Sequence, residues 1–178
     1  MVKNRILMLY SMAHVMTVQQ VKDFLKYAKI MYDRYDIIDI MKDGRKVSID
    51  VIVYLNDVEV GMIKSMHSVD MELQNKISNI PSHEGVNYIY GLTMQITNIV
   101  LEYNPEYFYI AGQPTLCMHV YNSINNQDIS TKCIEATTVR ESMDNPDGTK
   151  ISVFKHDRWR NVFIDESTVE QYNKLSSI

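Results

Sequence analysis

Histidine and cysteine are the side chains most often used for metal binding and nucleophilic catalysis, and in this sequence they form none of the common motifs. The five histidines have neither H-x-x-x-H nor H-E-x-x-H spacing. Cys117 and His119 lie two residues apart, which on a helix points them to different faces, so we predict no metal site. No G-x-x-x-x-G-K-S/T, G-x-S-x-G or G-x-G-x-x-G motif occurs either. The sequence therefore gives no support for a hydrolase, a kinase or a dehydrogenase.

A second group of candidate functional side chains, suited to binding, surrounds the only tryptophan. Arg158 and Arg160 flank Trp159, and Lys155 lies close by. Arg and Trp dominate binding hot spots and also stack on nucleic-acid bases. Two interpretations stay open. Either Arg158, Trp159 and Arg160 form a partner-binding surface, or Trp159 fixes the last hairpin to a C-terminal helix and the charges are solvated. The net charge of −4 argues against nucleic acid, so the first interpretation predicts a protein partner.

The composition is that of an ordinary globular protein. Hydrophobic residues make up 46% and charged residues 22% of the 178 residues, which indicates a single domain over 1–178. No apolar run is long enough to span a bilayer, and the N-terminal run is too short for a signal peptide. Cys117 and Cys133 are too few for a disulfide framework, which is typical of a cytosolic protein with reduced thiols.

The elements that position these residues begin with an apolar run and a helix. Residues 6–10 fit either a buried strand or a short helix. Thr17 and Gln20 form a capping box, and the apolar face of the helix that follows continues to Met31 at helical spacing.

An antiparallel meander is predicted next, because the apolar period changes from 3.6 to 2. Its strands are expected over 35–42, 46–55 and 58–66. Asp43-Gly44 and Asn56-Asp57 mark the two tight turns between them.

A long helix and a short strand follow the meander. Residues 68–79 stay open between a short helix and irregular structure. Beyond them an apolar stripe predicts a helix from about Gly85, which Pro105 ends. Residues 107–111 are apolar apart from tyrosine hydroxyls, as expected of a central strand covered on both faces.

The C-terminal part predicts a helix, a hairpin and a last helix. Thr115 can cap a helix that runs to about Ile124. The hairpin strands are expected over 132–139 and 150–156, around a turn at 145–148. Ser167 and Glu170 form a second capping box, so residues 157–178 are predicted as a C-terminal helical extension.

This order of elements resembles the GCN5-related N-acetyltransferase (GNAT) fold and a set of uncharacterised bacteriophage proteins with the same layout. Pro105–Ala111 and Val120–Ile124 carry the likeness: a strand after a proline leads into a helix with a tyrosine near its middle. The resemblance implies a GNAT-like α/β mixed sheet, an antiparallel meander plus a central parallel strand, with helices on both faces. It also implies a bacteriophage protein acting in the cytoplasm of an infected bacterial host.

Acetyltransferases of this fold hold the pyrophosphate of acetyl-CoA in a Q/R-x-x-G-x-G/A loop at the start of the long helix. Ser82, Gly85 and Asn87 are the residues that the resemblance places at such a cofactor. Only Gly85 matches the motif, and Glu84 puts a negative charge beside the expected phosphate. We therefore expect no cofactor, or acetyl-CoA if the protein is catalytic.

The family often uses a tyrosine in the helix after the central strand as a general acid, and Tyr121 matches that position. The alternative is that Tyr121 packs one face of a short helix. Candidates for a general base lie at the end of the meander: His67, Asp70 and Glu72. The main hypothesis is a diverged GNAT-like module that binds a host or phage protein without catalysis. The alternative is an N-acyltransferase that moves an acyl group from acyl-CoA to an amine.

Overall fold

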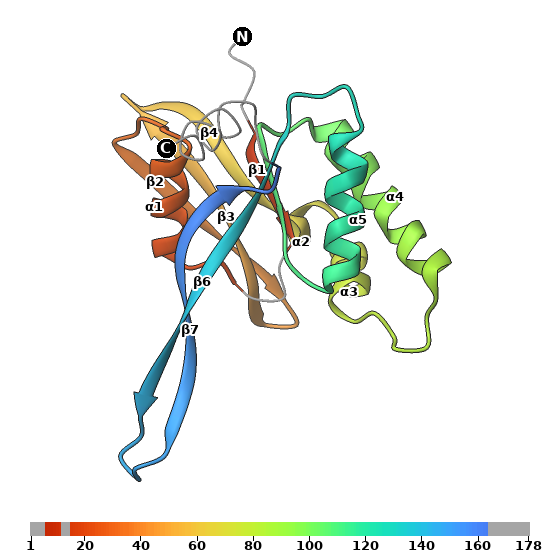
Figure 1. The fold of residues 1–178 in the computed structure, drawn as a ribbon. Helices are drawn as coiled ribbons and strands as arrows, with labels where there is room; N and C mark the ends of the chain where they lie inside the picture. Colours follow the sequence, from red (N-terminus) through yellow and green to blue (C-terminus); the bar gives the residue numbers. More distant parts are fainter. Residues whose placement is uncertain (1–5, 12–14, 164–178) are drawn as a thin grey trace, which may run out of the picture.

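One mixed sheet organises the molecule, and Figure 1 shows helices on both of its faces in a computed structural model that describes residues 6–11 and 15–163. The strands are β1 (Ile6–Ser11), β2 (Arg34–Lys42), β3 (Arg45–Leu55), β4 (Val58–Ser65), β5 (Tyr107–Ile110), β6 (Lys132–Asp144) and β7 (Lys150–Asn161). The helices are α1 (Val18–Tyr27), α2 (Met66–Val69), α3 (Met71–Ser78), α4 (Val86–Tyr103) and α5 (Pro114–Asn125). The strand order is β2-β3-β4-β1-β5-β6-β7.

The apolar run near the N-terminus is a strand, which decides between the two open interpretations. β1 lies in the middle of the sheet and pairs in parallel with β4 on one side and β5 on the other. Met8 and Leu9 are both fully buried although they point to opposite faces. A strand buried on both faces needs continuous apolar sequence, which is why no alternation marks this segment.

The meander is confirmed at both turns. Asp43 and Gly44 have φ values of 49° and 72°, and Asn56 and Asp57 have values of 51° and 61°. Two consecutive residues with positive φ give the twist that two-residue hairpins require. β3 therefore pairs antiparallel with both β2 and β4.

Two hydrophobic cores lie on the two faces of the sheet. On one face α1 packs against alternate strand residues: Met8, Val51, Val53, Ile63, Tyr107 and Tyr109. On the other face α3, α4 and α5 cover Leu9, Phe108 and Ile110. The predicted fold class is confirmed: the structure is an α/β mixed sheet, with an antiparallel meander, the central parallel strand β5, and helices on both faces, consistent with a GNAT-like layout.

The first helix begins as predicted and ends earlier. Thr17 accepts the N–H of Gln20, and the Gln20 side chain accepts the N–H of Thr17, which completes the capping box. The predicted apolar face extends too far, because Met31 is 75% exposed. Lys29 has a φ of 54°, so the chain leaves the helical path before it reaches Met31.

The α4–β5–α5 segment has the predicted order with one different cap. Asn104, in the left-handed conformation, ends α4 before Pro105. α5 is capped by Gln113, whose side chain accepts the Leu116 N–H, and the prediction of Thr115 as the cap is wrong. Pro114 is the first helical residue, a position that suits proline because an N–H there would have no acceptor in the helix and proline has no N–H.

The last hairpin is longer than predicted. The ladder runs from the Ile134–Asn161 pair to the Asp144–Lys150 pair, beyond the expected strand ends at Val139 and His156. The outer residues are mostly exposed, so no buried face marks them in the sequence. Residues 157–161 are therefore strand and not part of a helical extension. The helix predicted from Ser167 lies outside the described residues.

Candidate functional site

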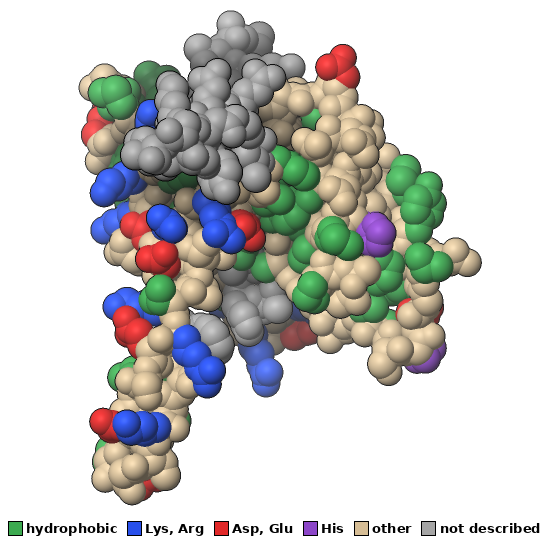
Figure 2. Space-filling model, viewed as in Figure 1, with side chains coloured by type: hydrophobic (Ala, Val, Ile, Leu, Met, Phe, Trp, Pro, Cys, Tyr) green, Lys and Arg blue, Asp and Glu red, His purple; other side chains and the backbone are tan. Residues whose placement is uncertain are grey.

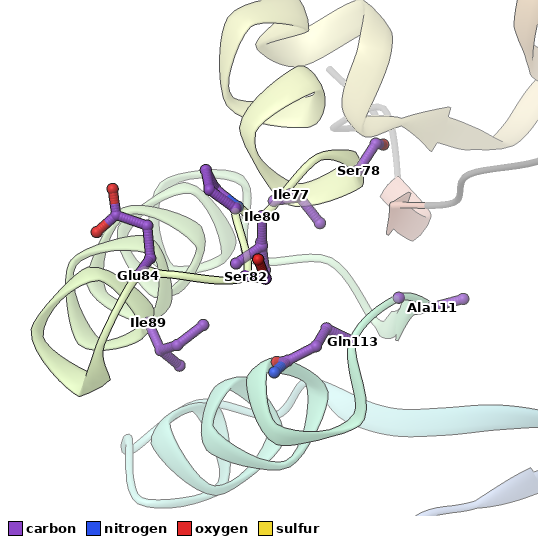
Figure 3. A pocket seen from close by; sticks show the side chains of 10 residues that line it. Ile77, Ser78, Ile80, Ser82, Glu84, Ile89, Ala111 and Gln113 are labelled. Atoms are coloured by element: carbon purple, nitrogen blue, oxygen red, sulfur yellow. The ribbon is translucent and has the colours of Figure 1, made fainter.

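A pocket lies beyond the carboxyl end of β5. Ala111–Gln113, which connect β5 to α5, form one wall, and the α3–α4 connection with the adjacent helix ends forms the other (Figure 3). Its volume of about 450 Å³ is in the range of small-molecule sites. The lining residues are Ile77, Ser78, Ile80, Pro81, Ser82, Glu84, Ile89, Ala111, Gly112 and Gln113. The lining combines apolar side chains with a few hydroxyl, amide and carboxylate groups.

Gln113 is a pocket residue that sequence reasoning missed. Its side-chain oxygen caps α5 at 2.9 Å from the Leu116 nitrogen, which leaves the amide nitrogen without a partner among the described residues. Figure 3 shows Gln113 and Ile89 pointing toward each other from α5 and α4. The signal was present, because a proline at the first helical position places the cap on the residue before it.

The predicted cofactor loop is brought to the pocket only in part. Ser82 lines the pocket, whereas Gly85 and Asn87 do not. Gly85 caps α4 through its backbone, and a Cβ added there would meet no atom within 4 Å, so no close approach requires a glycine. Glu84 lines the pocket and brings a negative charge to the helix N-terminus. This arrangement disfavours a pyrophosphate at this position.

Tyr121 has a structural position. Its side chain is 7% exposed, and its hydroxyl donates to the Ile134 carbonyl at 2.7 Å and accepts the Ile110 N–H at 3.2 Å. These contacts join α5 to the two strands β5 and β6. Burial raises the pKa of the Tyr121 phenol far above its usual value. Since Tyr121 does not line the pocket, its geometry supports packing over acid catalysis.

The three candidate bases, which lie on or between α2 and α3, make separate local contacts. Burial, with a smaller contribution from the charge of Lys42, lowers the pKa of His67. Asp70 caps α3 by accepting the Leu73 N–H at 2.9 Å, and Glu72 pairs with Lys76 at 2.8 Å. None of the three lines the pocket. The structure therefore does not bring a general acid and a general base together at this site.

A buried polar cluster at the end of β4 was also missed. Asp50, 5% exposed, accepts the Ser65 N–H at 2.8 Å and the Ser68 hydroxyl at 3.1 Å, with the Lys64 ammonium at 3.7 Å. The sequence signal was a carboxylate flanked on both sides by apolar residues, Ile49 and Val51, within a strand. The carboxylate lies at the start of α2, where it satisfies backbone and hydroxyl donors, so the cluster fixes the strand-to-helix junction.

Trp159 is a core residue, and its prediction as a binding surface is wrong. The side chain is 4% exposed and lies edge-to-face with Tyr109 and Phe24, at centroid distances of 5.0 and 5.9 Å. Its indole N–H donates to the Gln20 carbonyl at 3.1 Å. The tryptophan thus fixes β7 to α1, whereas the C-terminal helix that we expected it to contact lies outside the described residues.

The two arginines lie on the other side of β7, because successive strand residues face opposite ways. The Arg158 side chain is 73% exposed and the Arg160 side chain 58%. Arg160 pairs with Glu135 at 2.6 Å, and Arg158 lies 3.6 Å from Asp157. Only the charged part of the predicted cluster is on the surface, and both charges have acidic neighbours.

The distal part of the β6–β7 hairpin, residues 138–156, projects from the body as a two-stranded arm, which we call the β-arm (Figures 1 and 2). β6 pairs with β5 only at Lys132 and Cys133, and β7 is the last strand of the sheet. Among the described residues, neither outer edge of the β-arm is paired with another strand.

One face of the β-arm is largely apolar. The cross-strand pairs Met143–Ile151, Glu141–Val153 and Val139–Lys155 share this face, so it carries four apolar residues and the Glu141–Lys155 ion pair. Met143, Ile151 and Val139 are 52%, 45% and 42% exposed. By register, the opposite face holds the pairs Thr138–His156, Arg140–Phe154, Ser142–Ser152 and Asp144–Lys150.

The described residues contain no group of three or more His, Cys, Asp or Glu side chains that could hold a metal ion. In the same part of the chain, no helix combines the length and the apolar character that crossing a bilayer requires.

One comparison with known proteins identifies a family. Residues 56–160 match the family model described as "Uncharacterized protein MJ1673 family". This match covers more than half of the 178 residues, so the chain belongs to that family. No curated protein and no solved structure matches the chain. The matched segment includes the pocket residues and the β-arm, and it excludes β1 and α1.

Proposed function

We propose that this member of the MJ1673 family is a non-catalytic module that binds another protein through the β-arm. The observation that carries the proposal is a two-stranded ribbon whose two edges pair with no other strand in the described part of the chain and whose one face is mainly apolar. The partner is a host or phage protein, and the setting is the cytoplasm of an infected bacterial cell. Both of these statements rest on the resemblance to the bacteriophage proteins.

The backbone of the β-arm supports binding of an extended segment. Strand edges expose rows of N–H and C=O groups that can pair with an added strand. Proteins usually block such edges with prolines, bulges or a covering element. The register shift of this hairpin lies at Thr137–Thr138, at the base of the β-arm, so the ladder beyond it is regular. A partner strand can therefore pair along most of its length.

The side chains of the β-arm support a protein over a nucleic acid. Lys155 lies 3.7 Å from Glu141, and Lys150 lies 3.9 Å from Asp144, so positive charges have negative neighbours on the ribbon itself. A phosphate backbone needs a basic surface, which this ribbon lacks. Covering each half-exposed apolar side chain contributes roughly 1 kcal/mol to binding.

The test uses charge on one face of the β-arm with a matched control on the other. Tagged protein is captured from the cells that produce it, and bound proteins are quantified by mass spectrometry. Met143→Glu with Ile151→Glu is expected to abolish capture of a partner that the wild type binds. Ser142→Glu with Ser152→Glu adds the same charge to the opposite face, and this variant is expected to capture the partner as the wild type does. Equal capture by both double variants would exclude the apolar face as the binding surface.

Acyl transfer from acyl-CoA to an amine is the second candidate, and the pocket beside α4 favours it. Ser82 and Gln113 supply polar groups there, and Glu84 suits a cationic amine better than a pyrophosphate. A ligand that binds the folded state raises the melting temperature by mass action. A thermal-shift titration with acetyl-CoA therefore tests this candidate, and no shift at saturating cofactor would remove it.

A further inference from the structure

The outer surface of α4 carries an apolar stripe. Val86, Tyr90, Met94 and Leu101 are 73%, 65%, 38% and 37% exposed. At 100° per residue these four side chains fall within an arc of about 80° on the helix. The buried residues of α4 centre on the neighbouring arc, and the two arcs overlap at the buried Thr97, so the stripe is an exposed apolar face that borders the core.

The surface around this stripe is almost uncharged. The 18 residues of α4 include one ionisable acid, Glu102, and no Lys or Arg. The 12 residues of α5 include no Asp, Glu, Lys or Arg. Across the whole chain 22% of the residues are charged, so these two helices, which reach the surface, are depleted of charge. Loss of charge combined with exposed Tyr and Met is the composition of an interface centre.

A shallow groove between the two helices extends this surface. It has a volume of about 260 Å³ and is lined by Val86, Ile89, Tyr90, Thr93, Met94, His119, Asn122 and Ser123. Met118 of α5, 56% exposed, adds apolar area beside it. Figure 2 shows several hydrophobic side chains and a histidine on the side of the molecule that the helices α4 and α5 form.

We propose that a second copy of this chain covers the stripe and groove, and that the two α4 helices cross near Met94. The net charge of −4 makes two copies repel elsewhere, whereas this uncharged face allows their approach. The same face offers no charge to attract a charged partner. Met94 lies near the middle of α4, so a twofold axis there places it beside Met94 of the partner subunit.

The available area agrees with what a stable dimer needs. α4 is about 27 Å long at 1.5 Å per residue, and two packed helices are about 20 Å wide. The projected area is therefore about 500 Å², and the accessible area of such a ridged surface is larger. Specific interfaces begin at about 600 Å² per partner, so α4 and α5 provide a surface near the lower end of that range.

Sedimentation velocity over a concentration series tests the proposal. The wild type is expected to dimerise at concentrations up to about 100 µM, a range that covers the micromolar limit for interfaces of this size. Met94→Glu places two like charges at the twofold axis and is expected to weaken the dimer by about 100-fold or more. Gln95→Glu adds the same charge on the exposed polar side of α4 and is expected to leave the dimer unchanged.

A mixing experiment separates loss of the interface from loss of the fold. Met94→Lys alone is expected to be monomeric, but an equimolar mixture with Met94→Glu is expected to recover a heterodimer, because opposite charges then meet at the axis. A wild type that stays monomeric over the whole range would overturn the proposal, including the case in which this face binds a different protein. Equal dimerisation of Met94→Glu and Gln95→Glu would overturn it as well.

Discussion

Replacing Tyr121 by Phe removes a buried hydroxyl that joins three elements and keeps the aromatic ring. The hydroxyl lies 2.7 Å from the Ile134 carbonyl oxygen and 3.2 Å from the Ile110 nitrogen. Without it, one acceptor on β6 and one donor on β5 lose a partner in a site that is 7% exposed. A buried polar group left unpaired costs about 1–3 kcal/mol, and we expect Tyr121→Phe to lower the free energy of unfolding by about 2 kcal/mol.

Thermal and urea denaturation measure this loss. For a chain of this length, about 2 kcal/mol corresponds to a decrease in melting temperature of roughly 4–8 °C. Tyr103→Phe is the matched control, because its half-buried hydroxyl has no hydrogen bond to a described residue, and we expect a change of less than about 0.5 kcal/mol there.

The reasoning is refuted if Tyr121→Phe melts within about 1 °C of the wild type, since the hydroxyl would then contribute nothing to stability. A variant of unchanged stability that loses acyl transfer activity would instead support the role of Tyr121 as a general acid.

Three further predictions follow from buried side chains. Trp159→Ala opens a cavity against α1 and should lower the free energy of unfolding by about 3–5 kcal/mol. Urea denaturation measures this loss, and a variant as stable as the wild type would contradict the packing of Trp159. Burial raises the pKa of Tyr10 and Tyr109 to about 12, so the folded protein keeps protons that the unfolded chain releases above pH 10. The stabilisation from these two protonated phenols should be fully present below pH 10 and should decrease as the pH rises toward 12. Urea denaturation midpoints measured over this range test it, and midpoints that do not change with pH would contradict the prediction. Burial also raises the pKa of the Cys117 and Cys133 thiols, to about 11 and about 12. Ellman's reagent should therefore modify both slowly at pH 8 and rapidly after unfolding, whereas fast reaction of the folded protein would refute this.

The parts of the fold that were predictable are those set by local physics. The Asp43-Gly44 turn and the Thr17–Gln20 capping box act within four residues, and both are present in the structure. The position of β1 between the meander and β5 was not predictable from its own sequence. Its neighbours are chosen by contacts with strands more than 50 residues away, and a fully apolar strand contains no marker for them.

The tryptophan cluster shows why the candidate site was only partly predictable. In the linear sequence Arg158, Trp159 and Arg160 form one group, but on a strand the middle residue faces opposite to its neighbours. The error followed from ending β7 at His156. The strand continues to Asn161, but the amino-acid composition of residues 157–161 does not show this continuation. Likewise, Gln113 and Ser82 line the same pocket only because the fold brings the β5–α5 connection beside the α3–α4 connection. No local sequence pattern connects the two residues.

The β-arm and the stripe on α4 lie at opposite sides of the molecule, so the two proposed interfaces do not compete (Figure 1). A twofold dimer formed through α4 would present two β-arms to the solvent. A partner with two binding segments would then gain avidity, which raises apparent affinity by about 10²–10⁴ without any new contact. In that case Met94→Glu weakens capture of a bivalent partner and leaves the affinity for a single segment unchanged. The double variant Met143→Glu with Ile151→Glu, by contrast, abolishes both the capture of a bivalent partner and the binding of a single segment. Both variants are measured with one-segment and two-segment forms of the partner. The pattern of effects then distinguishes the β-arm, which binds the partner, from the α4 stripe, which forms the dimer.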